Sequence, residues 1–142
     1  MAFQQDCIFC KIARNELPAA KVFENETLIA FLDINPIAPG HLLLITKHHY
    51  ASLFEASEAA AGDLGSILPR LARAVCRGVE APALNVVANT GREAGQVVDH
   101  LHWHLIPRRE GDRLFGPWPH RAYGQGEQES VRERIETVLL SD

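Results

Sequence analysis

Short apolar runs separated by polar and turn-forming residues predict that much of the chain folds into β-strands. Five runs have this character: residues 21–23, 28–32, 41–45, 84–88 and 97–106. The polar residues 24–27 join the first two runs, which predicts a hairpin. The third run is apolar throughout and is typical of a strand that is buried on both faces. Pro107 is expected to end the last strand.

Helical spacing of apolar residues appears in two other parts of the chain. Residues 57–77 follow it, with Ser57 suited to the N-terminal turn, while Pro69 leaves open a kink or a split into two helices. Residues 127–140 predict a closing helix, and the stretch 108–126, rich in Gly, Pro and Arg, is expected to be irregular. Five strands with two or three helices and mostly short connections favour an α+β meander over alternating βαβ units.

Composition narrows the class of protein and of ligand. The chain has 142 residues, 46% of them hydrophobic and 23% charged, so we expect a single domain over residues 1–142. A net charge of -4 provides no broad basic field, which favours a small phosphorylated ligand over a nucleic acid polymer. No segment approaches the roughly 18 apolar residues of a membrane helix, and the N-terminus does not resemble a signal peptide. We therefore expect a cytoplasmic protein that does not bind membranes.

The strand at residues 97–106 carries the pattern with the clearest chemical meaning. Alternation along a strand puts His100, His102 and His104 on one face, about 6.6 Å apart, and Leu101, Trp103 and Leu105 on the other. Three histidines in register would each need a buried polar partner in an ordinary core, which disfavours a purely structural role. Two alternatives remain open: the histidines ligate a metal, or one is a nucleophile while its neighbours position phosphate oxygens.

The loop at residues 89–96 directly precedes this strand. It supplies amide side chains, glycines and turn N–H groups, which suit an anionic oxygen, although an ordinary polar loop has the same composition. Next to three aligned histidines, the loop predicts a phosphate-binding segment.

Cys7 and Cys10 form a Cys-x-x-Cys pair, which indicates metal or redox chemistry in a reducing compartment. The pair lacks the preceding strand of a thioredoxin-like unit, which disfavours the redox role. A metal site needs about four ligands, and Cys76 lies in a helical pattern where a cysteine is typical of apolar packing. Histidines would therefore have to complete a metal site.

The stretch from His100 to Leu105 resembles the His-x-His-x-His-hydrophobic motif of the histidine triad family. Four further segments are similar to family segments in the same order: residues 7–12, 28–34, 39–45 and 95–96. The likeness runs from about residue 6 to 108, and residues 109–142 diverge. It implies a five-stranded antiparallel sheet with two to three helices, in a homodimer whose two sheets join into a continuous ten-stranded sheet.

The resemblance also implies an activity. Family members cleave at the α-phosphate of nucleoside phosphoramidates or dinucleoside polyphosphates through a nucleotidyl-histidine intermediate. By matching, His102 is the nucleophile, its Nδ1–H bonds the carbonyl of His100, and His104 contacts the phosphate or the leaving group. We therefore expect a nucleotide hydrolase or transferase for adenosine or another purine nucleotide. The alternatives are a zinc-dependent hydrolase that uses the histidines as an open metal site, and a nucleotide-binding interaction protein with vestigial activity.

The same matching assigns residues to the nucleotide. They are Ile8, Phe9, Ile12, Phe31, Asp33, Ile34, Asn89, Gly95, Gln96, His102 and His104. The apolar ones would form walls around the base, although core packing explains Ile8, Ile12, Phe31 and Ile34 equally well. Asp33 would accept the ribose hydroxyls, and an Asx turn before Pro36 is its competing explanation.

For the cysteine pair, the resemblance implies a structural zinc held by Cys7, Cys10, His49 and His100, with His48 as the rival to His49. The sequence also departs from the family pattern. Val97 stands where a serine often reaches the phosphate bridge, which removes one donor there. His41 and His120 are interpreted as structural or solvated.

Overall fold

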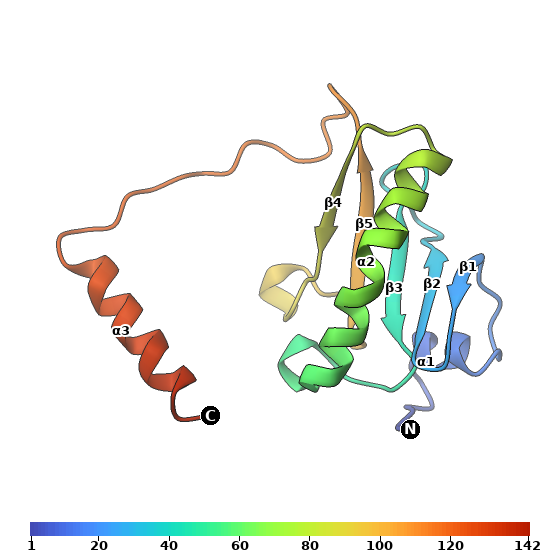
Figure 1. Cartoon of the computed structure of the whole chain (residues 1–142), viewed down its shortest axis with the longest axis horizontal. Coiled ribbons are helices and arrows are strands. Elements are labelled where there is room, and N and C mark those ends of the chain that lie inside the picture. Colours follow the sequence, from blue (N-terminus) through green and yellow to red (C-terminus); the bar gives the residue numbers. More distant parts are fainter. The chain divides into compact units, whose positions relative to one another are not determined.

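The computed structural model describes residues 1–142, and its internal contacts divide the chain into two units, 1–112 and 113–142 (Figure 1). The first unit holds a five-stranded antiparallel sheet with two α-helices, and the second unit holds a third helix. The predicted α+β class and the predicted antiparallel sheet are therefore confirmed. The expectation that all 142 residues form one domain stays a prediction.

The strands are connected as a meander with one exchange of order. They are β1 (Lys21–Glu24), β2 (Leu28–Leu32), β3 (Leu42–Thr46), β4 (Ala83–Val87) and β5 (His102–Arg108). The order in the sheet is β1-β2-β3-β5-β4, and every neighbouring pair is antiparallel. The histidine strand β5 thus lies inside the sheet, while β4 and β1 form its edges.

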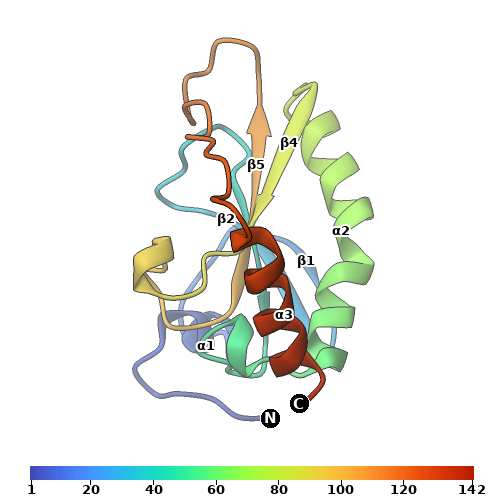
Figure 2. The ribbon, with the colours of Figure 1, turned by 90° about the vertical axis from the view of Figure 1, so that its left-hand side faces the viewer.

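The sheet separates two apolar clusters, because successive side chains of a strand point to opposite faces. Every residue of β3 is buried. Leu42 and Leu44 belong to the cluster on the side of helix α2 (Glu58–Gly78), whereas Leu43 and Ile45 pack toward helix α1 (Ile8–Ala13). Figure 2 shows the two helices on opposite sides of the sheet. This arrangement confirms the prediction that the 41–45 run is buried on both faces.

Helix α2 covers one face of the sheet as a single helix. Ser57 caps it, since its hydroxyl accepts a hydrogen bond from the Ala60 N–H at 3.1 Å. Leu64 and Leu71 are seven residues apart, share one side of the helix and are buried. Pro69 is exposed, and the helix continues through it, so the split into two helices does not occur.

The histidine strand differs from the predicted one at both ends. It begins at His102 rather than at residue 97, because the backbone turns at His100, whose N–H bonds the carbonyl of Val98 at 2.9 Å. Pro107 does not end the strand, which reaches Arg108. Beyond Leu105, β5 pairs with β4 but no longer with β3. Because the β3 side of β5 has no neighbouring strand there, Pro107 can lie in the strand although it lacks a backbone N–H.

Residues 113–142 are described by themselves. The stretch 113–126 has no regular secondary structure, and α3 (Glu127–Leu139) follows it, as the sequence predicts. None of the residues of α3 is buried. No helix of the structure combines the length and the apolar character that a membrane crossing requires.

Candidate active site

Four side chains from three distant parts of the chain converge below the end of β3. The Sγ of Cys7 lies 3.3 Å from Nδ1 of His100, and the Sγ of Cys10 lies 3.3 Å from Nδ1 of His49. The two Nδ1 atoms are 3.2 Å apart. A tetrahedral zinc with bonds of about 2.0–2.3 Å separates its ligands by roughly 3.3–3.8 Å. The two sulfurs and two nitrogens therefore match a closed, four-ligand metal site.

The tautomer of His100 also suits a ligand. Its ring is fully buried, and its Nε2–H donates to the carbonyl of Thr46 at 2.7 Å, which leaves a lone pair on Nδ1 facing the two thiols. Burial lowers the pKa of His100 to about 4, so the ring is neutral at pH 7. The rival His48 lies elsewhere, where its Nδ1 accepts from the Ala2 N–H at 2.9 Å.

Helix α1 positions the two cysteines, and the sequence analysis did not predict this helix. It is six residues long, and Cys7 caps it through a contact of 3.4 Å between its Sγ and the Cys10 N–H. The turn brings both thiols to one side. Phe9, between them, points into the sheet and packs edge-on against the rings of His100 and His102, at 5.8 and 5.2 Å between ring centres.

His102 is held in one orientation by its own backbone neighbour, as the sequence predicts. Its Nδ1–H donates to the carbonyl of His100 at 2.6 Å, so the lone pair is on Nε2. The side chain is 6% exposed, and burial lowers its pKa, against the opposing effects of this hydrogen bond and of the Asp33 charge. A neutral imidazole with one free nitrogen can attack an electrophile without a separate base.

His104 is oriented by His41, a residue whose role the sequence analysis missed. The Nδ1 of His41 accepts a hydrogen bond from the Ile37 N–H at 3.2 Å, so its proton is on Nε2. That Nε2–H lies 2.9 Å from Nδ1 of His104 and donates to it. Burial lowers the pKa of both rings, that of His104 to about 4. Neutral His104 therefore carries its own proton on Nε2, where it acts as a hydrogen-bond donor.

His41 is neither solvated nor a simple packing residue, because it is 4% exposed and contacts His104. The sequence signal that points to His41 is the alternation of side chains along an extended strand, which places residues 41 and 43 on the same face. His41 precedes β3 and shares a face with Leu43, which pairs with His104 in the register of the sheet. No pattern in the sequence indicates that β3 and β5 are neighbours in the sheet.

Asp33 forms the Asx turn that was one of its two explanations, and its contact with ribose hydroxyls stays a prediction. Its Oδ1 accepts from the Asn35 N–H at 2.9 Å, which is the Asx turn. Its Oδ2 lies 3.8 Å from Nε2 of His41, beside the histidines. The carboxylate is thus fixed by the turn with one oxygen directed to the site.

The predicted base-pocket residues fall into two groups. Phe9, Ile12 and Phe31 are buried in the cluster on the α1 side of the sheet. Ile8 and Ile34 are 47% and 85% exposed. Phe9, in the first group, packs against the ring of His102, and the second group presents apolar surface to solvent. Contact of either group with a base stays a prediction.

The loop before β5 is held by hydrogen bonds of one of its own side chains. The amide of Gln96 donates to the carbonyls of Ala51 and Val98 at 2.7 and 3.0 Å and accepts from the Gly91 N–H at 2.9 Å. Gly91 and Gly95 have φ angles of 89° and 90°, which only glycine adopts without strain. Gln96 therefore shapes the loop through its side chain, and direct phosphate contact by Asn89, Gly95 or Gln96 stays a prediction.

Comparisons of the sequence agree with these features. A model of the HIT domain matches residues 14–111. Adenylylsulfatase HINT3 of Arabidopsis thaliana is 39% identical over 112 residues, which cover 79% of this chain and 57% of that protein. Adenosine 5'-monophosphoramidase HNT1 of Candida albicans is 37% identical over 144 residues, covering 98% of this chain and 95% of that protein.

Comparisons of the fold lead to the same group of proteins. The crystal structure of SMU.412c from Streptococcus mutans UA159 has a TM-score of 0.92 at 34% identity, covering 96% of this chain and 87% of that chain. A zinc-bound histidine triad family protein from Mycobacterium smegmatis has a TM-score of 0.73 at 32% identity, covering 94% and 97%. With the family model covering most of residues 1–112 and the histidines aligned as described, the chain belongs to the histidine triad family.

Proposed function

We propose that this protein hydrolyses nucleoside phosphoramidates, with adenosine or another purine as the base, through a nucleotidyl-His102 intermediate. The observation that carries the proposal is the fixed tautomer of His102, whose Nδ1–H bonds the carbonyl of His100 at 2.6 Å and leaves Nε2 free. The names of relatives support the substrate class, since HNT1 of Candida albicans is an adenosine 5'-monophosphoramidase. Dinucleoside polyphosphates, cleaved at the same α-phosphate, are the second substrate class.

The reaction proceeds in two displacements. Nε2 of His102 attacks the α-phosphorus, and the amine departs with the electron pair of the P–N bond and takes a proton from solvent. A water molecule then attacks the phosphorus of nucleotidyl-His102, loses a proton to solvent and returns the P–N electron pair to Nε2. The Nε2–H of His104 donates a hydrogen bond to the charge that develops on the phosphoryl oxygens or the leaving group. Asp33 accepts the ribose hydroxyls.

We propose zinc as the ion of the Cys7, Cys10, His49 and His100 cluster. A bound zinc would tie the N-terminal segment and the residues after β3 to the start of β5, as a closed site without an open position for substrate. The donor set, the separations and the free Nδ1 lone pair of His100 support this assignment. The buried Nε2 of His49, which has no hydrogen-bond partner, is consistent with a ring held from its Nδ1 side.

An open metal site built from the three triad histidines is disfavoured by their hydrogen bonds. His100 faces the thiols, Nδ1 of His104 accepts from His41, and Nδ1 of His102 donates to a carbonyl. The three rings therefore do not direct lone pairs to a common point.

We also propose that the protein forms a homodimer and lies in the cytoplasm. Strand β4 is an edge of the sheet, and its pairing with β4 of a second copy would form the ten-stranded sheet of a homodimer. Three free cysteines suit the reducing cytoplasm.

The decisive experiment follows the adduct. Wild-type protein mixed with adenosine 5'-monophosphoramidate and quenched early should carry one nucleotidyl group on His102 by mass spectrometry. His102→Ala should retain nucleotide binding and lose both adduct and turnover. Adduct on another residue, or turnover by His102→Ala, would exclude the mechanism, and binding by wild type without turnover would favour the interaction protein.

The metal has its own test. Protein purified without added metal should contain one zinc per chain, and Cys7→Ser should lose the zinc and unfold at a lower temperature, because a structural site contributes to folding. Cys76→Ser is the matched control, since Cys76 lies outside the cluster. Wild-type protein that is metal-free and equally stable would remove zinc from the proposal.

A further inference from the structure

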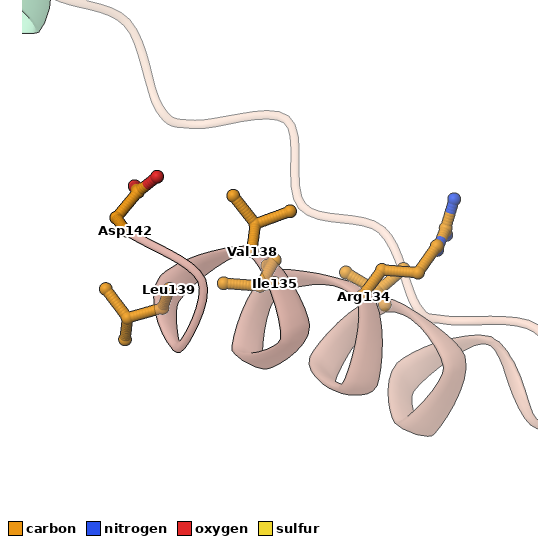
Figure 3. A pocket seen from close by; sticks show the side chains of 6 residues that line it. Arg134, Ile135, Val138, Leu139 and Asp142 are labelled. Carbon is orange, nitrogen blue, oxygen red and sulfur yellow. The ribbon is translucent and has the colours of Figure 1, made fainter.

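Helix α3 carries an apolar stripe that nothing within residues 113–142 covers. Val131, Ile135, Val138 and Leu139 follow one another at helical spacing and line one surface of the helix. Figure 3 shows Ile135, Val138 and Leu139 of this stripe. Ile135, Val138 and Leu139 are 62%, 61% and 71% exposed. The stretch 113–126 contains no helix or strand that would pack on them. The stripe therefore needs apolar surface from elsewhere.

Helix α3 also has few interactions of its own that would keep it folded in isolation. It has 13 residues, and isolated helices of that length are marginal in water. Its N-cap, Gly126, makes no side-chain hydrogen bond to the first turn. Arg132 pairs with Glu129 and Glu136 at 2.7 Å, but such exposed pairs add only a few tenths of a kcal/mol. Packing of the stripe is the remaining source of stability.

The unit 1–112 has an apolar groove of matching character. It encloses about 250 Å³ between the second half of α2 and the β1–β2 end of the sheet, and Val22, Leu32, Leu42, Leu71, Ala74 and Val75 line it. Val22 and Leu32 are 57% and 40% exposed. Large side chains so exposed at the mouth of an apolar groove mark an interaction surface.

Charge on the two surfaces is complementary. The second half of α2, from Leu68 to Gly78, contains Arg70, Arg73 and Arg77 and no acidic residue. Helix α3 contains four glutamates and two arginines, a net charge of 2 − 4 = −2. A helix laid in the groove beside α2 would place its glutamates near these arginines.

We propose that α3 of one copy of this chain docks into the groove beside α2 of a second copy, with its apolar stripe against Val22, Leu32 and Val75. The exchange is reciprocal, because a two-fold axis makes the same contact twice and covers both stripes and both grooves. It does not depend on the proposed hydrolase activity. It gives the proposed homodimer a contact that is separate from the β4 edges.

Two full-length variants test the two halves of this contact by hydrogen–deuterium exchange of the α3 amides. In wild type these amides should exchange at least about tenfold more slowly than in either variant. Ala74→Trp fills the groove at an exposed helical position, and Ile135→Asp with Val138→Asp makes the stripe polar. Ala59→Trp, at an exposed position in the first turn of the same helix, and Thr137→Asp, outside the stripe, should leave the exchange slow.

Mixing the two variants decides between a second copy and the same chain. The unaltered α3 sequence in the mixture comes only from Ala74→Trp copies, whose own groove is blocked. Slow exchange of that segment after mixing means that it docks on the other variant, as proposed. Exchange equal to that of the unmixed variants would place the contact within one chain. Fast exchange in wild type, or slow exchange in Ala74→Trp, would exclude the groove as the site.

Discussion

The hydrogen bond from His41 to His104 decides which nitrogen of His104 carries its proton, and we predict that its removal slows the proposed reaction. In His41→Phe, a ring of similar size fills the buried site, but no donor remains for Nδ1 of His104. The imidazole of His104 is then free to rotate and to exchange tautomers. Its Nε2–H donor is no longer fixed in the orientation that the reaction uses.

The size of the fall in kcat follows from the loss of the hydrogen bond between His41 and His104. A hydrogen bond between neutral groups is worth about 0.5–1.5 kcal/mol, which corresponds to roughly 2- to 13-fold in rate. Complete loss of a required tautomer costs on the order of 10⁴ in a serine protease triad, but His104 remains able to adopt the productive tautomer. We therefore expect kcat to fall about tenfold. KM should stay nearly unchanged, because the donor acts on charge that develops during the reaction.

Steady-state kinetics with adenosine 5'-monophosphoramidate measure this effect. His41→Gln should recover part of kcat, since its amide N–H can donate to Nδ1 of His104, and His120→Phe, at an exposed histidine, should match wild type. Melting temperatures of the variants separate a folding defect from a catalytic one. Equal kcat in wild type and His41→Phe would refute the tautomer argument, and so would a Gln variant no better than Phe.

Three further predictions concern stability and rate. Burial lowers the pKa of His104 from 6.5 to about 4, so between these pH values the unfolded chain binds a proton at His104 that the folded chain does not. The free energy of unfolding, measured with urea, should therefore decrease as the pH falls from about 6.5 to 4. In His104→Gln this decrease should be less steep. Gly40 has a φ of +87°, and a Cβ added there would lie 2.7 Å from Val79, so Gly40→Ala should destabilise the fold by more than about 1 kcal/mol. Gly62→Ala, at an open helical position, should stabilise the fold by about 0.5–1 kcal/mol. Urea midpoints of the two variants that shift in the same direction would contradict this reasoning. Val97→Ser introduces a hydroxyl donor at a side chain that is 90% exposed, and kcat for phosphoramidates should rise. An unchanged kcat would mean that this position has no role in leaving-group departure.

Sequence analysis predicted the elements that rest on local patterns. The capped helix at 58–78, the all-buried strand at 42–46 and the helix at 127–139 each follow from spacing and composition within one segment. The errors arose where distant segments decide the outcome. The backbone turn at His100 that delays the start of β5 is accompanied by a bond from the Leu101 N–H to the carbonyl of Tyr50, a residue far away in the sequence. The tolerance of Pro107 depends on which strands flank it.

The distinction between local patterns and contacts of distant segments also explains which residues of the candidate site the sequence predicted. The Cys-x-x-Cys pair and the alternating histidines are local signals, so Cys7, Cys10 and His102 were identifiable from the sequence. The alternation that places His41 on the face of Leu43 is not sufficient to identify it, because its contact with His104 depends on the pairing of β3 with β5. Gln96 is similar: its amide chemistry indicates a polar contact, but only the fold shows that its contacts are with the backbone of its own loop and of Ala51.

His100 links the cluster of cysteines to the nucleophile through two different parts of one residue. Its side chain lies among Cys7, Cys10 and His49, and its carbonyl accepts the Nδ1–H of His102. The Nε2–H bond to Thr46 fixes the ring relative to β3, so the position of the carbonyl is set from both sides. Because a carbonyl that moves by a fraction of an ångström changes the direction of the His102 lone pair, substitutions at the cysteines should alter kcat as well as stability. An altered kcat in Cys7→Ser beside an unchanged kcat in Cys76→Ser would support this route from the cysteine cluster to His102, and equal kcat values in the two variants would contradict it.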